Sequence, residues 1–85
     1  MSSLVRILKL ISSRNVEVTV TYESASDSYI FHITKRDVPI KTTVCFAMSR
    51  TCLDYAIEGE DLLYFYMEEN IDKLEKMTAE LHEIE

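Results

Sequence analysis

Glycine and proline are scarce in this chain, which has one residue of each among 85. These two residues interrupt helices and strands most strongly, so their scarcity leaves little room for long loops. Gly59 is the only glycine, which excludes the glycine-rich loops that hold nucleotide phosphates. The length favours a single domain over residues 1–85 with one modest core.

Long apolar runs are also missing. A membrane-spanning helix needs roughly 20 consecutive apolar residues, and no stretch of the sequence approaches that length. The N-terminal segment MSSLVRILKLISSR has an apolar stretch, but Arg6 and Lys9 interrupt it and no small-residue cleavage site follows. We therefore expect neither a membrane span nor a signal peptide, and we interpret the protein as cytoplasmic.

Cysteine and histidine are too few and too scattered to predict a metal site. Cys45 and Cys52 form no C-x-x-C motif, and we expect them to be buried free thiols in a reducing compartment. Neither has a neighbouring base of the kind that a nucleophilic cysteine needs. We expect His32 to be exposed on a strand and His82 to be a favourable cation near a helix C-terminus. The sequence thus predicts no metal, no cofactor and no enzymatic activity.

Charge is distributed unevenly along the chain. Residues 1–50 hold seven Lys or Arg and four acids, a balance of +3, whereas residues 51–85 hold two Lys and eleven acids, a balance of −9. Such asymmetry indicates a charged partner, here one with a basic surface. The isoelectric point near 4.8 predicts repulsion from nucleic acid, so we expect no direct nucleic-acid binding.

Hydrophobic periodicity in the first half predicts one helix followed by three strands. Apolar residues recur at helical spacing from Leu4 to Ile11, after a cap at Ser2 or Ser3. Strict alternation then predicts strands over 16–23 and 28–35, which should pair as a hairpin, and a third strand over 40–48.

The C-terminal third is predicted to be helical. Ser49 or Thr51 can cap a short helix, which Gly59 should interrupt, and a long helix should run over 60–85. This helix would be about 39 Å long against roughly 20–27 Å for the strands, so it should overhang the sheet by two turns or more. The order α-β-β-β-α-α predicts an α+β fold, a three-stranded antiparallel sheet with helices on one face and a wet opposite face.

The stretch EGEDLLYFYMEEN, residues 58–70, combines apolar and acidic residues in an unusual way. Leu63, Tyr64 and Met67 share one helical face, whereas Leu62, Phe65 and Tyr66 point elsewhere. Either neighbouring helices clasp both faces, or the aromatic residues stay exposed as a binding surface. The candidate partner-binding residues are Glu58, Glu60, Asp61, Glu68, Glu69 and Asp72 for charge, with Tyr64 and Tyr66 as anchors.

The segments SLVRILKLISSRNVEVTVTYES and SYIFHITKRD, with the acid-rich residues 54–85, together resemble small phage-encoded accessory proteins. Some anti-CRISPR inhibitors of RNA-guided nucleases have this layout. The likeness covers most of the chain in layout and charge, without a shared motif, so it assigns a role to no residue. It implies an acidic surface that occupies a nucleic-acid-binding groove on a host protein.

We therefore expect a non-enzymatic binding protein whose acidic, aromatic-bearing C-terminal helix binds a basic protein surface. As an inhibitor it would imitate nucleic acid only sparsely, because residues 60–85 carry about one net charge per 5.6 Å against one per about 1.7 Å in duplex DNA. The alternative is a self-associating structural module, a homodimer paired through the apolar stripe of the same helix.

Overall fold

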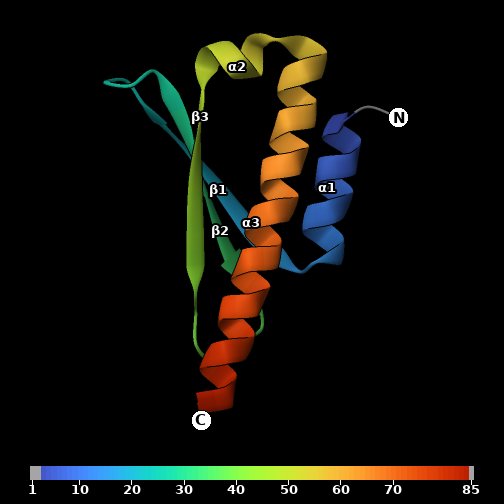
Figure 1. The fold of residues 1–85 in the computed structure, drawn as a ribbon, viewed down its shortest axis with the longest axis vertical. Coiled ribbons are helices and arrows are strands. Elements are labelled where there is room, and N and C mark those ends of the chain that lie inside the picture. Colours follow the sequence, from blue (N-terminus) through green and yellow to red (C-terminus); the bar gives the residue numbers. More distant parts are fainter. Residues whose placement is uncertain (1–2, 85) are drawn as a thin grey trace.

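The computed structural model describes residues 3–84, with side chains described for 4–55 and 61–82. The three strands form one antiparallel sheet in the order β1-β2-β3, and the helices lie against one of its faces (Figure 1). This confirms the predicted α+β fold and the order α-β-β-β-α-α. The elements are α1 (Ser3–Ser13), β1 (Val16–Glu23), β2 (Ser28–Lys35), β3 (Thr43–Ser49), α2 (Arg50–Asp54) and α3 (Ala56–Ile84).

Alternate residues of each strand face the helices, as the sequence pattern predicts. In the central strand β2, Phe31 lies opposite Val20 of β1 and Phe46 of β3. The rings of Phe31 and Phe46 stack with centroids 4.8 Å apart. The other face of the sheet is open and mostly polar. Its outer-strand residues are Glu17, Thr19, Thr21, Glu23, Thr43, Cys45, Ala47 and Ser49, all exposed.

The core lies between the sheet and α3. The predicted apolar stripe of α3 supplies its centre, because Met67, Ile71 and Leu74 are almost completely buried. α1 adds Ile7 and Leu10, which pack beside α3. The stripe proposed as a seam between two copies is therefore already covered by the chain's own sheet and first helix.

The boundary between the last two helices differs from the prediction at Gly59. α2 ends at Asp54, Tyr55 is extended, and α3 begins at Ala56 and continues through residue 59. A glycine inside a helix costs about 1 kcal/mol relative to alanine, and the packing of a 29-residue helix outweighs that cost. Ser49 is the cap of α2, since its hydroxyl accepts a hydrogen bond from the Cys52 N–H at 3.2 Å.

The third strand begins at Thr43 and not at residue 40. Pro39 has no N–H to donate to a sheet, and residues 36–42 instead form an irregular connection that reaches the end of α3. There the hydroxyls of Thr42 and Thr78 are 2.9 Å apart. With 29 residues, α3 is about 44 Å long. Its last turns extend past the sheet, as predicted (Figure 1).

The molecule is flat, measuring 44 × 34 × 15 Å. Its radius of gyration of 13.8 Å exceeds the roughly 12 Å expected for a compact chain of this length. α1 lies alongside α3, and β1 starts near the C-terminal end of α1, while the β1–β2 hairpin projects away from α1 and α3 (Figure 1). Apolar side chains at this margin are consequently left uncovered.

Candidate protein-binding surface

α3 presents two different sides beyond its buried stripe. With about 3.6 residues per turn, residues three, four and seven positions apart fall on one side of a helix. The α1-facing side comprises Tyr64, Glu68, Asp72 and Glu75. The side turned to solvent carries what we call the outer patch, which comprises Leu62, Phe65 and Tyr66.

The α1-facing side begins with an aromatic ring covered by a cation. Tyr64 is half-buried against the core, and the Arg6 guanidinium lies 4.2 Å from the centre of its ring. The Tyr64 hydroxyl donates to Glu68 Oε2 at 3.4 Å. A cation over an aromatic face is an attractive contact, so α1 occupies the position that a partner's basic residue would take at Tyr64.

Further along the same side, two cations bind one carboxylate. Arg14 Nε donates to Glu75 Oε1 at 3.0 Å and Lys35 Nζ donates to Glu75 Oε2 at 3.2 Å. Arg14 also pairs with Asp72. Partial burial opposes ionisation of Glu75, but the hydrogen bonds from Arg14 and Lys35 outweigh it and lower the pKa of Glu75. Basic residues of the first half thus neutralise part of the acidic second half within one chain.

Among the residues with described side chains, none covers the outer patch in this way. Leu62, Phe65 and Tyr66 are 40%, 57% and 37% exposed, on successive turns of α3. The rings of Phe65 and Tyr66 are 5.8 Å apart, and Tyr66 lies 6.0 Å from Phe46 of β3. Tyr55, the residue before α3, is exposed at the same end of the helix. The aromatic rings therefore contact one another and remain partly exposed to solvent.

The eight predicted partner-binding residues do not form one surface. Tyr64, Glu68 and Asp72 lie on the α1-facing side, and Tyr66 and Glu69 are exposed on the outer side. Asp61 is exposed near the start of the described part of α3. The side chains of Glu58 and Glu60 lie outside the described residues.

Two residues of the outer patch were not among the predicted anchors. Leu62 and Phe65 share a helical side with Tyr66, and their spacing of three and four residues could have identified them. Tyr55 could not be found in this way. The prediction placed it inside a short helix that ended at Gly59, whereas it marks the break between α2 and α3.

A second polar cluster holds the β1–β2 turn against the start of α2. Tyr22 donates its hydroxyl proton to Asp27 Oδ1 at 2.5 Å, and Arg50 Nε lies 3.0 and 3.2 Å from the two Asp27 oxygens. These bonds, first from Arg50 and then from Tyr22, lower the pKa of Asp27. Because all three side chains are well exposed, this cluster ties two segments together and encloses no site.

The residues that could hold a metal or act as a nucleophile remain dispersed. His32 lies opposite Thr19 and Cys45 on the open sheet face, with Nε2 3.4 Å from Thr21 Oγ1. Cys45 is exposed, so the expectation that both thiols are buried is wrong, because residue 45 points to the open side of β3. Within the described ranges, no three metal-binding side chains come together.

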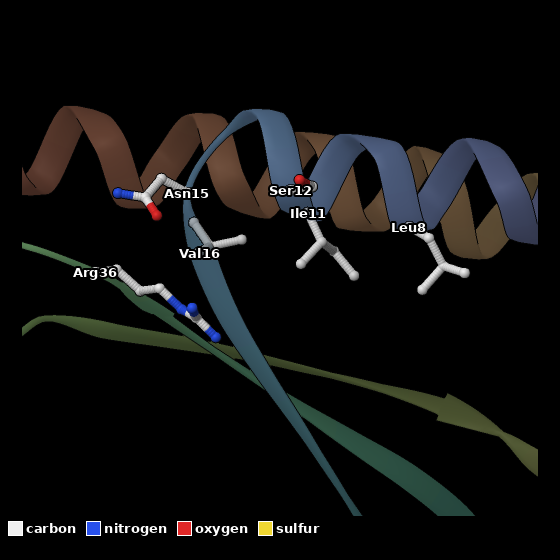
Figure 2. A pocket seen from close by; sticks show the side chains of 6 residues that line it. All are labelled: Leu8, Ile11, Ser12, Asn15, Val16 and Arg36. Carbon is white, nitrogen blue, oxygen red and sulfur yellow. The ribbon is translucent and has the colours of Figure 1, made fainter.

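A groove separates α1 from the start of β1. It has a volume of about 330 Å³ and is lined by Leu8, Ile11, Ser12, Asn15, Val16 and Arg36. Figure 2 shows Leu8 and Ile11 pointing from α1 toward the strands, and Arg36 reaching the same space from the end of β2. α1 lines the groove with Leu8 and Ile11 and with the polar Ser12, and Arg36 places a cation at one end.

Helices capable of crossing a membrane, by length and apolar content, do not occur in the described part of the chain. In comparisons with known proteins, no family model, curated protein or solved structure matches the chain.

Proposed function

We propose that this chain is a non-enzymatic protein-binding module of the cytoplasm, and that the outer patch on α3 is its contact surface. The observation that carries the proposal is the exposure of three large apolar side chains, Leu62, Phe65 and Tyr66, on successive turns of one helix. Aromatic residues that stand on a rigid element and lose water on contact dominate the energy of protein interfaces. The free thiols of Cys45 and Cys52 agree with a reducing compartment.

The partner is a protein with an apolar pocket and a basic rim. Asp61 and Glu69 are exposed on α3 within one turn of the outer patch, and the whole chain carries a net charge of −6. Charges at the rim of an interface mainly accelerate association and select partners by sign. The anti-CRISPR-like layout supports a more specific form, in which the basic surface is the nucleic-acid groove of a host protein.

The proposal assigns separate roles to the two kinds of residue. Phe65 and Tyr66 supply most of the affinity, because they bury apolar area, whereas Asp61 and Glu69 supply salt-dependent attraction. Tyr64 and Asp72 contribute less than their sequence positions imply, because Arg6 and Arg14 already contact them. Glu68 already accepts a hydrogen bond from Tyr64.

The test compares three baits on a lysate of the cells in which the protein acts. The baits are the unchanged chain, Phe65→Ala with Tyr66→Ala, and Glu80→Lys as a matched change at an exposed site of α3 away from the patch. A protein retained by the first and third baits alone is then purified, and its Kd is measured at low and high salt.

We expect the double alanine variant to weaken this purified partner's binding by at least tenfold, and Asp61→Lys with Glu69→Lys to weaken it most at low salt. A partner that binds the double alanine variant as tightly as the unchanged chain would contradict the proposal. The proposal would also be contradicted if every captured protein bound all three baits equally well.

A further inference from the structure

The two edge strands of the sheet, β1 and β3, differ in how much of their helix-facing side chains is exposed to solvent. On β3, the helix-facing residues Val44 and Met48 are buried. On β1, burial fades along the strand, since Val16 is 2% exposed whereas Val20 and Tyr22 are 51% and 52% exposed. The helices cover the start of β1 and leave its end to solvent.

Apart from the charges of Glu17 and Glu23 and the cover over Val16, β1 lacks the features that protect an edge strand from further pairing. It pairs with β2 without a bulge from the Val16–Lys35 pair to the Glu23–Ser28 pair. Its eight residues include no proline, lysine or arginine. Natural proteins usually shorten, bend, charge or cover their edge strands, and a long regular edge without these features is a template for another strand.

We propose that β1 pairs antiparallel with β1 of a second copy of this chain, about a twofold axis at Thr19, to form a continuous six-stranded sheet. In this register Val18 lies opposite Val20 of the second copy, and Glu17 lies opposite Thr21. Paired residues then belong to the same face of the sheet, so apolar residues meet apolar residues.

The neighbouring registers that keep the faces matched are less favourable. An axis at Val20 would place Glu17 opposite Glu23 of the second copy, and like charges directly opposite each other destabilise a sheet. An axis at Val18 would leave both Tyr22 and Glu23 opposite residues that precede the strand, whereas the axis at Thr19 leaves only Glu23 in that position. The sequence of β1 therefore selects the register about Thr19.

The same axis brings the bare end of each β1 beside the covered start of the other. Tyr22 lies opposite Val16 of the second copy, and Val16 lines the groove under α1. Leu8, which is 57% exposed, and Ile11 point into that groove (Figure 2). The Tyr22 ring is thus placed beside a groove in which Leu8 still exposes apolar surface.

In the proposed register, Glu23 lies opposite Asn15 of the second copy. The Asn15 carbonyl accepts from the Arg36 N–H at 3.1 Å and the Asn15 amide donates to Asp37 at 3.0 Å. A cation and an anion therefore both lie near each Glu23, so the seam depends on its apolar pairs and not on charge. The seam uses β1 and α1 and leaves the outer patch of α3 free, so this inference is independent of the proposed function.

The first experiment tests the register by disulfide formation in the full chain with Cys45→Ser and Cys52→Ser. Directly opposed residues of antiparallel strands have Cα atoms about 4.5–5.5 Å apart, within the range of a disulfide. Thr19→Cys should therefore crosslink two chains under mild oxidation. Thr21→Cys is the matched control, because the two copies of residue 21 would be four positions, about 14 Å, apart along the strands.

A covalent dimer with Thr19→Cys alone supports the register. Crosslinking at both positions, at residue 21 alone, or at neither overturns it. Because collisions can also crosslink chains, the second experiment measures mass by light scattering without any added cysteine. We expect twice the chain mass of 9.9 kDa at low and at high salt, since an apolar seam resists screening.

Val20→Lys should convert this dimer to a monomer, and its circular dichroism should stay unchanged because residue 20 is already half exposed in the single chain. Phe65→Ala is the matched control on α3 and should remain dimeric. A monomeric unchanged chain, or a Val20→Lys variant that remains a dimer, would overturn the inference.

Discussion

The two sides of α3 contain the same kinds of residue and have opposite surroundings. Tyr64 and Phe65 are adjacent in sequence, yet Arg6 covers the first ring and the second is 57% exposed. Glu75 accepts hydrogen bonds from two cations, whereas Glu69 lies exposed on the solvent side. The difference arises because α1 packs along only one side of the helix.

This comparison shows why an acidic segment need not form an acidic surface. The negative charge of the C-terminal third and the positive charge of the first half meet where α1 lies against α3. Arg14 and Lys35 bind Glu75, and Arg14 also binds Asp72. What remains for a partner on the other side is mainly apolar, so shape and aromatic area are expected to matter more than charge.

The largest contrast should appear when the same substitution is made toward the core and toward solvent. Leu74 is fully buried and Leu62 is 40% exposed. Leu74→Ala should lower the free energy of unfolding by about 2–5 kcal/mol, because it removes buried methyl groups and leaves a cavity, while Leu62→Ala should lower it by less than about 1 kcal/mol. Urea denaturation followed by circular dichroism measures both. Equal losses would mean that the outer patch is covered in the isolated protein.

A smaller contrast is expected between the adjacent aromatic residues. Tyr64→Ala should destabilise the fold by about 1–3 kcal/mol, below the 3–5 kcal/mol typical of fully buried aromatic residues, because its ring is half-buried under Arg6. Phe65→Ala should change stability by about 0.5 kcal/mol or less. Tyr64→Phe controls for the hydroxyl, which makes only a 3.4 Å bond to Glu68. A larger loss at Phe65 than at Tyr64 would reverse our assignment of the two sides.

Local pattern was sufficient to predict the elements and the buried stripe. Alternation in β2 and β3, and the four-and-three spacing from Met67 to Thr78, report directly which side chains are buried. In β1 the alternation gives the side that faces the helices, but Val20 and Tyr22 on that side are half exposed. The open polar face followed from the same alternation. These features depend on residues close in sequence, so a single sequence was sufficient to predict them.

The features that were missed depend on contacts between distant residues. Helix α3 passes through Gly59 because its packing outweighs a local preference. The pairing of Arg14 with Asp72 and Glu75 depends on how α1 packs against α3. The hydrophobic periodicity of the sequence does not indicate that packing. The candidate site was therefore predicted on the right helix, but the sequence could not divide its residues between the two sides.

The third contrast, between Glu75 and Glu69, should be about 1 kcal/mol and should depend on pH. Because contacts in the fold lower the pKa of Glu75, its ionised form stabilises the protein above the unfolded-state pKa of about 4.3. That stabilisation should be lost as the pH falls through the lower folded-state pKa. Glu75→Gln should therefore destabilise the protein at pH 7 and reduce the loss of stability on acidification.

Glu69→Gln is the matched control, since it removes the same charge from an exposed site on the other side of α3. Asp27, whose pKa is also lowered, is present in both variants, so the difference between them isolates Glu75. Urea denaturation at a series of pH values from 3 to 7 makes the comparison. If both variants followed the unchanged chain at every pH, the ion pairs on the α1-facing side would not stabilise the fold in solution, and Glu75 and Asp72 would be available to a partner after all.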